Sequence, residues 1–169
     1  VNTCSVRDHA EQRAIGRLLD LSRHRDAVIV VCGCMAQRLG AALFDLVPAV
    51  RIVAGTGSYA LLPDAIAAAV REEGRFVFLE MDDHGEYDAP PLKSKGGVSR
   101  YVSITRGCEN YCSYCIVPYL RGKTRSRSAD AIVREISSVV ACGAKEVTML
   151  GQNVIAYRDG RIDFIGLAG

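Results

Sequence analysis

Short apolar runs and amphipathic segments alternate along the first 80 residues, and this alternation limits the possible folds more than any other feature. Residues 27–32 (AVIVVC) form a continuous apolar run, which is typical of a strand buried on both faces. Strands are also predicted at residues 51–54 and 76–79, and helices at residues 8–25, 35–46 and 63–74. Because alternating strands and helices build a parallel sheet covered by helices, we expect an α/β domain. In its last helix we expect Ile66, Ala69 and Val70 to form one apolar face.

A second α/β unit follows a change in composition. Residues 81–97 (MDDHGEYDAPPLKSKGG) show no apolar periodicity, so we predict an interdomain linker there, between domains at 1–80 and 98–169. The second domain should begin with a strand at 101–105, a helix at 128–142 and a strand at 146–150. Ser128 can cap this helix and Gly143 can end it. Its expected buried positions are Ile132, Ile136, Val139 and Val140.

Composition narrows the class of protein. The chain has 169 residues, a net charge of +2 and no apolar run near the roughly 20 residues that cross a bilayer, so no membrane association is expected. Seven cysteines, an odd number, in a helix-rich chain without a secretory signal favour reduced thiols that serve a metal or cluster. Because the chain starts at Val1 and ends without a recognisable element, we expect a piece of a longer protein, inactive by itself.

Cys108, Cys112 and Cys115 lie within eight residues, directly after the predicted strand at 101–105. Loops at the carboxyl ends of parallel strands build active sites in barrel folds. A structural zinc site needs four ligands, and the nearest histidine, His84, lies across the linker. Three cysteines on a four-iron cluster leave one iron open for catalysis. We therefore favour a cluster over a zinc site or buried core thiols.

The C-x-x-x-C-x-x-C spacing, with Tyr114 before the last cysteine, resembles the signature of radical S-adenosylmethionine (SAM) enzymes. The resemblance implies that Cys108, Cys112 and Cys115 hold a [4Fe-4S] cluster whose open iron binds S-adenosyl-L-methionine. Reductive cleavage of the sulfonium would then give a deoxyadenosyl radical. The reaction would take place on this cofactor, so we assign no catalytic side chain.

Four further segments narrow the resemblance to the radical SAM methylthiotransferases: residues 2–7 (NTCSVR), 33–38 (GCMAQR), 121–127 and 150–154 (LGQNV). This family implies an amino-terminal Rossmann- or flavodoxin-like parallel-sheet domain, here without its first strand. The first strand–helix–strand part of a radical SAM TIM-like barrel would follow. It also implies a second, auxiliary [4Fe-4S] cluster, with Cys4 and Cys34 as two of its three ligands and the third upstream of this chain.

The remaining candidate residues surround these cysteines. Gly151, Gln152 and Asn153 follow the strand at 146–150, where related enzymes bind the cofactor, and Tyr114 could stack on its adenine. Four cations alternate along residues 121–127, and in an extended segment they would share one side. They could contact RNA phosphates or the cofactor carboxylate, or simply face solvent. These cations are Arg121, Lys123, Arg125 and Arg127.

The other two thiols, Cys32 and Cys142, occupy positions typical of small buried residues, so we expect structural roles for them.

The resemblance is strongest to the branch that acts on tRNA. It implies addition of a methylthio group to carbon 2 of a prenylated adenosine beside the anticodon. We would then expect a cytoplasmic monomer that uses an electron donor such as flavodoxin or ferredoxin. Two other family substrates remain open: threonylcarbamoyladenosine in tRNA and an aspartate of a ribosomal protein. A noncatalytic zinc- or RNA-binding module is the alternative from another class.

Overall fold

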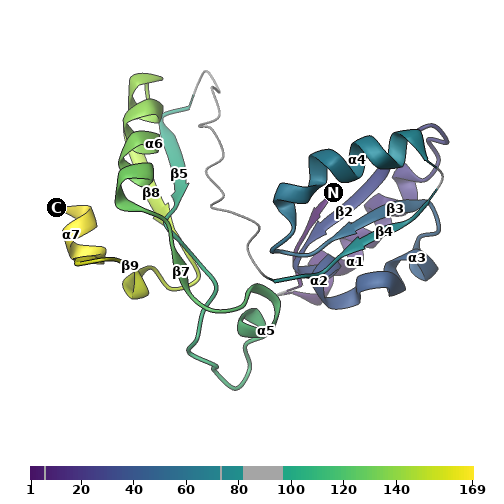
Figure 1. Cartoon of the computed structure of the whole chain (residues 1–169), viewed down its shortest axis with the longest axis horizontal. Helices are drawn as coiled ribbons and strands as arrows, with labels where there is room; N and C mark the ends of the chain where they lie inside the picture. The colour runs from purple at the N-terminus through teal and green to yellow at the C-terminus, as the bar shows by residue number, and fades with distance from the viewer. Residues whose placement is uncertain (6, 73, 82–96) are drawn as a thin grey trace. The chain divides into compact units, whose positions relative to one another are not determined.

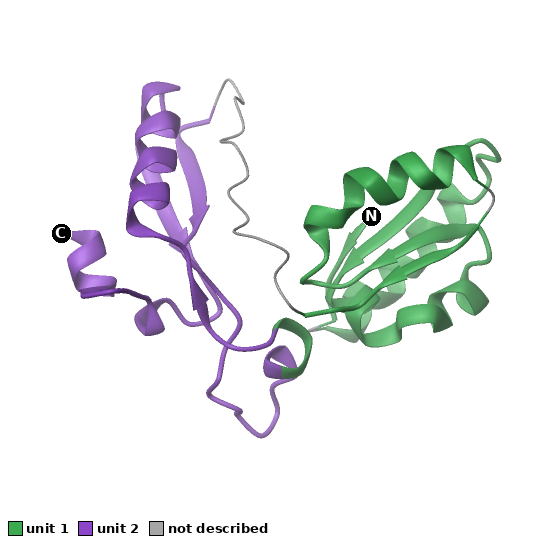
Figure 2. Ribbon diagram, viewed as in Figure 1, with its two compact units in different colours: residues 1–85, 119–121 green, residues 86–118, 122–169 purple. Residues whose placement is uncertain are grey.

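The computed structural model describes residues 1–5, 7–72, 74–81 and 97–169, which fall into two compact units (Figures 1 and 2). The first unit comprises residues 1–85 and 119–121, and the second comprises residues 86–118 and 122–169. Apart from Met81 and Gly97, the predicted linker at 81–97 lies outside the described residues.

A four-stranded parallel sheet forms the centre of the first unit, in the order β1-β2-β3-β4. Its strands are β1 (Asn2–Thr3), β2 (Ile29–Gly33), β3 (Val50–Ala54) and β4 (Phe76–Phe78). The predicted α/β class is confirmed. The edge strand β1 was not predicted, because two residues are too few to show a strand periodicity.

Helices cover both faces of this sheet (Figure 1). Helices α1 (Asp8–Leu21), α2 (Cys34–Leu39) and α3 (Leu43–Leu46) pack on one face, and α4 (Leu62–Arg71) packs on the other. Two 3-10 turns, η1 (Gly40–Ala42) and η2 (Tyr59–Leu61), precede α3 and α4. The hydrophobic core between the sheet and helices α1–α3 includes the fully buried Leu18 and Val31, and the core between the sheet and α4 includes Ile52.

Two sequence expectations for this unit are wrong. The single helix predicted at 35–46 is interrupted at Gly40, whose φ of +52° does not fit a right-handed helix. In α4 the buried residues are Ala65 and Ala69, whereas Ile66 and Val70 are 40% and 69% exposed. The residues that pack on the sheet are Leu62, Ala65 and Ala69, so the predicted face was rotated by about one residue.

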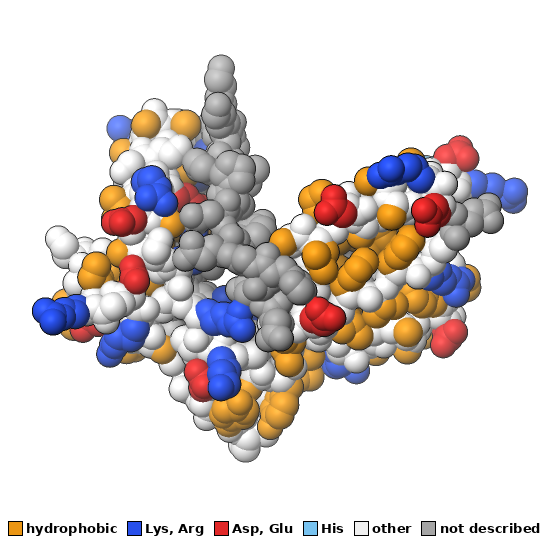
Figure 3. Space-filling model, in the orientation of Figure 1, with side chains coloured by type: hydrophobic (Ala, Val, Ile, Leu, Met, Phe, Trp, Pro, Cys, Tyr) orange, Lys and Arg blue, Asp and Glu red, His pale blue; other side chains and the backbone are white. Residues whose placement is uncertain are grey.

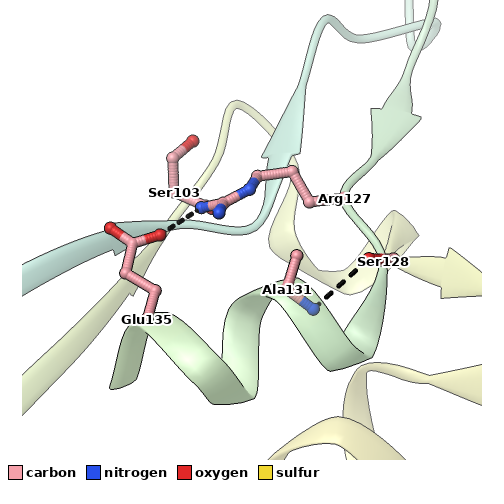
Figure 4. Close-up of polar contacts among 5 residues, drawn as sticks. All are labelled: Ser103, Arg127, Ser128, Ala131 and Glu135. Carbon is pink, nitrogen blue, oxygen red and sulfur yellow. Dashed lines mark hydrogen bonds and ion pairs between the residues drawn. The ribbon is translucent and has the colours of Figure 1, made fainter. Parts of the chain in front are cut away.

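The second unit contains the predicted strand–helix–strand arrangement. Strands β5 (Ser99–Ser103) and β8 (Glu146–Leu150) pair in parallel, and α6 (Ala129–Ala141) connects them. Ser128 Oγ accepts a hydrogen bond from the Ala131 amide at 3.3 Å (Figure 4), and Gly143 follows the helix with φ +101°. In the predicted stripe of α6, Ile132 and Val139 are buried but Val140 is 51% exposed.

Short elements complete this unit. Strands β6 (Thr105–Arg106) and β7 (Arg125–Ser126) pair antiparallel, as do β9 (Arg158–Asp159) and β10 (Ile162–Asp163). The short helices are α5 (Val117–Arg121), the 3-10 turn η3 (Val154–Ala156) and α7 (Phe164–Ala168). No helix in the part of the chain that the structure describes is long and apolar enough to span a membrane.

Tyr157 is fully buried in the core of the second unit, and its hydroxyl donates to the Arg127 carbonyl oxygen at 2.9 Å. Burial raises the pKa of this phenol, and the Asp159 carboxylate raises it further, while Arg127 opposes the shift. An unfolded tyrosine ionises at about pH 10. The unfolded chain therefore loses this proton first, and the contribution of Tyr157 to stability is lost as pH rises through the folded pKa.

Tyr157→Phe should lower the free energy of unfolding at neutral pH by about 1 kcal/mol, because one buried hydrogen bond is lost. The wild-type protein should lose stability more steeply than the variant above about pH 10. Urea unfolding of both proteins between neutral and strongly alkaline pH measures this difference. Parallel pH profiles would contradict the buried, neutral phenol.

Candidate metal centre

The three clustered cysteines lie on the loop of residues 107–116, between β6 and α5. Cys108 and Cys115 are half-buried, and Cys112 is exposed. The Cys115 amide donates to the Cys112 carbonyl oxygen at 2.9 Å, which closes a turn. Tyr111 has a φ of +45° and is the one non-glycine residue with positive φ among those described. The loop therefore turns sharply between the first and second cysteines.

Backbone contacts join the start of this loop to the segment after α5. Gly107 has a φ of +78°, and a Cβ atom there would lie 2.0 Å from the Lys123 carbonyl oxygen and 2.7 Å from that of Gly122. The Cys108 amide donates to the same Gly122 oxygen at 3.2 Å. The backbone of Cys108 is thus held against the segment after α5, and only glycine fits at the preceding position.

Residues 151–153, predicted to lie near the cofactor, contact the beginning of the same loop. Gln152 Oε1 accepts a hydrogen bond from the Gly107 amide at 2.9 Å. Thr105 Oγ1 donates to the Asn153 carbonyl oxygen at 3.3 Å, and a Cβ atom on Gly151 would lie 1.9 Å from that hydroxyl. The carboxyl end of β8 therefore supports the residue that immediately precedes Cys108.

The donor set of the loop suits iron–sulfur chemistry. None of the seven cysteines, all of which are described, forms a disulfide. The described residues contain no group of three or more His, Cys, Asp or Glu side chains arranged to hold a metal ion. The three thiols nevertheless share one short loop, and thiolates are the usual ligands of such clusters. Their types and spacing fit a cluster, and the side chains would have to turn toward one another to bind it.

Tyr114 lies within this loop, and the predicted basic segment begins at the end of the helix that follows it. Tyr114 is 91% exposed. Arg121 ends helix α5 and Gly122 has a φ of +71°, so residues 121–127 are not extended throughout, although Arg125–Ser126 forms β7. Lys123 and Arg125 are exposed. On the face drawn in Figure 3, Lys and Arg side chains are interspersed with Asp and Glu rather than gathered in one basic patch.

Arg127, directly after β7, is engaged in contacts within the second unit. Its Nη1 donates to the Ser103 carbonyl oxygen at 2.8 Å and lies 2.6 Å from the Glu135 carboxylate on α6 (Figure 4). Both side chains of this ion pair are about one-fifth exposed. These contacts show a structural use of Arg127 that the charge pattern alone did not reveal.

In the first unit, the fold brings Cys4 and Cys34 to neighbouring positions. Thr3 and Gly33 are register partners of β1 and β2, and each cysteine directly follows one of them. Adjacent strands lie about 4.8 Å apart, so the two cysteines start side by side at the carboxyl edge of the sheet. Gly33 has a φ of +96°, and a Cβ atom there would lie 2.5 Å from the Thr3 carbonyl oxygen. Cys34 is 4% exposed and Cys4 is exposed.

Sequence reasoning did not assign a role to Gln37, which links two loops at the same edge of the sheet. Its Nε2 donates to the Leu79 carbonyl oxygen at 2.9 Å, and its Oε1 accepts from the Thr56 amide at 3.0 Å. A Cβ atom on Gly55 would lie 1.9 Å from that Oε1. The sequence feature that could have indicated this role is the position of Gln37 within the segment 33–38.

The two remaining thiols differ in their surroundings. Cys32 is half-buried, and burial raises its pKa. Cys142 is exposed, so the buried position predicted for it is wrong: it follows the last residue of α6, where the helix leaves the core.

Alkylation should therefore modify Cys142 before Cys32. At mildly alkaline pH the exposed thiol is accessible to iodoacetamide, whereas the thiol with the raised pKa supplies less thiolate. Peptide mass mapping during brief labelling under anaerobic conditions measures the order. Equal rates at both positions would contradict the burial of Cys32.

Comparison with known proteins extends these observations. Residues 1–55 match the family described as "Uncharacterized protein family UPF0004", and residues 102–168 match the Radical SAM superfamily. The chain is 44% identical over 174 residues to the tRNA-2-methylthio-N(6)-dimethylallyladenosine synthase of Geobacter metallireducens, with 99% of this chain and 40% of the relative covered. Over nearly its whole length, the chain is similar to the radical SAM methylthiotransferases.

Other relatives show similar identity. The synthases of the same name from Lawsonia intracellularis and Clostridium perfringens are 42% and 38% identical, with 93% and 98% of this chain and 37% and 39% of the relatives covered. The chain thus spans about two fifths of the length of these methylthiotransferases. The radical SAM match includes the cysteine loop, and membership of that superfamily implies a [4Fe-4S] cluster and S-adenosyl-L-methionine.

Proposed function

We propose that this chain is part of an enzyme that adds a methylthio group to carbon 2 of N6-dimethylallyladenosine in tRNA, beside the anticodon. The observation that carries the proposal is the cysteine loop, whose first residues are supported by the carboxyl end of β8 through Gln152. The identity of 38–44% to synthases named for this product supports the choice of substrate.

In this proposal Cys108, Cys112 and Cys115 would hold the radical SAM cluster. When bound, the cluster and S-adenosyl-L-methionine would supply the radical that removes hydrogen from carbon 2 of the adenosine. Gln152 and the Gly122 carbonyl oxygen orient the loop through the backbone amides of Gly107 and Cys108. Gly151, Gln152 and Asn153 would also border the cofactor.

The exposed side chains beside the loop would bind the cofactor and the substrate. The ring of Tyr114 is 91% exposed and can stack on adenine. Lys123 and Arg125 are exposed and can contact tRNA phosphates, which would make binding depend on salt concentration. Arg121 is half-buried at the end of α5, and Arg127 is engaged with Glu135, so we propose no phosphate contacts for these two residues.

We further propose a second [4Fe-4S] cluster on the first unit, with Cys4 and Cys34 as two of its ligands. The adjacent positions of these cysteines, after the paired residues Thr3 and Gly33, support this site. It would carry the sulfur that is transferred. A low-potential donor such as flavodoxin or ferredoxin would supply electrons to a monomeric enzyme in the cytoplasm, where tRNA is modified.

Mass analysis of hydrolysed tRNA tests the substrate. A strain lacking the gene should contain no 2-methylthio-N6-dimethylallyladenosine, and the wild-type gene should restore it. Intact product in the deletion strain would overturn the proposal. Loss of the methylthio form of threonylcarbamoyladenosine instead would assign the chain to the sibling activity.

Anaerobic reconstitution of the full-length gene product tests the chemistry. Two clusters would give about eight irons per chain and a brown absorbance. Incubation with S-adenosyl-L-methionine and a reductant should then release deoxyadenosine. A protein that binds zinc and cleaves no cofactor would instead be a noncatalytic module.

A further inference from the structure

We infer that Glu11 is a positioning residue that joins the chain segments carrying Cys4 and Cys34, and thereby sets the spacing of the two thiols. The inference rests on the proposed auxiliary cluster. The evidence for the inference is that one buried carboxylate lies between two chain segments that are far apart in the sequence.

Glu11 lies in the first turn of α1 and is 8% exposed. Its two carboxylate oxygens have different partners. Oε1 forms an ion pair with Nη2 of Arg38, and Oε2 accepts a hydrogen bond from Ser5 Oγ at 3.3 Å. The carboxylate therefore connects α1 with two other segments of the chain.

Each partner is tied to one of the two cysteines. Ser5 directly follows Cys4, and Arg38 lies four residues after Cys34 in α2. Residues four apart lie on the same face of a helix, so Arg38 and Cys34 are neighbours along α2. Glu11 thus reaches the Cys4 segment through one oxygen and the helix of Cys34 through the other.

The position of Glu11 is itself well defined. Leu18, two turns further along α1, is fully buried in the core and fixes the helix on the sheet. The β1 strand, by contrast, contributes two residues at the edge of the sheet. The Cys4 segment therefore has little regular structure of its own, and the contact with Glu11 supplies part of its restraint.

The burial of its carboxylate distinguishes this ion pair from an ordinary surface pair. The side chains of Glu11 and Arg38 are 11% and 39% exposed, whereas those of Asp20, near the end of α1, and Arg23, just beyond it, are 56% and 82% exposed. Exposed pairs contribute little to stability, but removing Arg38 would leave the buried Glu11 carboxylate uncompensated. Asp20→Asn is therefore a control that removes a carboxylate from α1 without disturbing the cysteines.

The test uses the full-length gene product with Cys108, Cys112 and Cys115 replaced by alanine, so that only the auxiliary site can bind iron. Glu11→Ala and Arg38→Ala are made in this parent. Glu11→Gln keeps the shape of the side chain and an oxygen for Ser5, which guards against misfolding. Val47→Ala is a second control, because Val47 is fully buried just before β3, toward the amino ends of the strands, whereas Cys4 and Cys34 follow the carboxyl ends of β1 and β2.

After anaerobic reconstitution, iron per chain, the electron paramagnetic resonance spectrum of the reduced cluster and the melting temperature are measured for each variant. We expect Glu11→Ala and Arg38→Ala to lower iron content several-fold and to alter the spectrum of the remaining cluster. The iron content of Glu11→Gln should lie between that of these two variants and that of the parent. Asp20→Asn and Val47→Ala should keep the iron content and spectrum of the parent. This should hold for Val47→Ala even when it lowers the melting temperature as much as Glu11→Ala does.

Two results would overturn the inference while leaving the auxiliary cluster in place. One is a Glu11→Ala protein with the iron content and spectrum of the parent. The other is an equal loss of iron in Val47→Ala, which would show that general stability controls loading. A parent that binds no iron would overturn the proposed auxiliary cluster itself, and this inference with it.

Discussion

Cys112→Ala in the full-length gene product is expected to remove about half of the bound iron and to abolish methylthiolation completely. A [4Fe-4S] cluster needs its cysteine thiolates, and we propose only three on this loop. Cys112 is exposed and makes no contribution to the core, so the variant should fold and melt like the wild type. Iron analysis, cofactor cleavage and tRNA mass analysis measure the three effects.

Cys142→Ala is the matched control for this experiment, because it also removes an exposed thiol from the second unit. It should retain both the iron and the activity. Full cofactor cleavage by Cys112→Ala would show that Cys112 is not a ligand, and equal losses in the two variants would show that any exposed thiol matters.

Gly107→Ala is expected to have the second-largest effect, again a loss of the radical SAM cluster. The new methyl group would meet the backbone oxygens of Lys123 and Gly122 at 2.0 and 2.7 Å, which cannot both move while β6 and β7 stay paired. Positive φ alone costs an alanine of order 1 kcal/mol or more. The segment carrying Cys108 should therefore separate from its support, with little iron bound at that loop.

Gly160→Ala separates the clash from the backbone strain. Gly160 has a φ of +55°, but a Cβ atom there would meet nothing within 4 Å. This variant should lose some stability and keep its full iron content. Iron content and melting temperature are measured for Gly107→Ala and Gly160→Ala. Equal iron contents in the two variants would show that the close approach at Gly107 does not position the loop.

Local patterns predicted much of the fold because they depend on neighbouring residues. The strand at 146–150 and the helix after Ser128 follow from apolar periodicity and a capping side chain within one turn. The same patterns failed where a single backbone angle intervened, as at Gly40 and Gly122. They also failed where the orientation of a helix decides exposure, as for Val70 and Cys142.

The amino-acid sequence by itself determined the α/β class, the cysteine spacing of the loop and the family resemblance, because each depends on residue types along a short stretch of chain. Only the tertiary structure decided which distant segments meet. The strand register sets Cys4 beside Cys34, Glu11 joins Ser5 to Arg38, and Gln152 holds Gly107. These contacts join residues up to 45 positions apart, and packing of the core, rather than local propensity, brings them together.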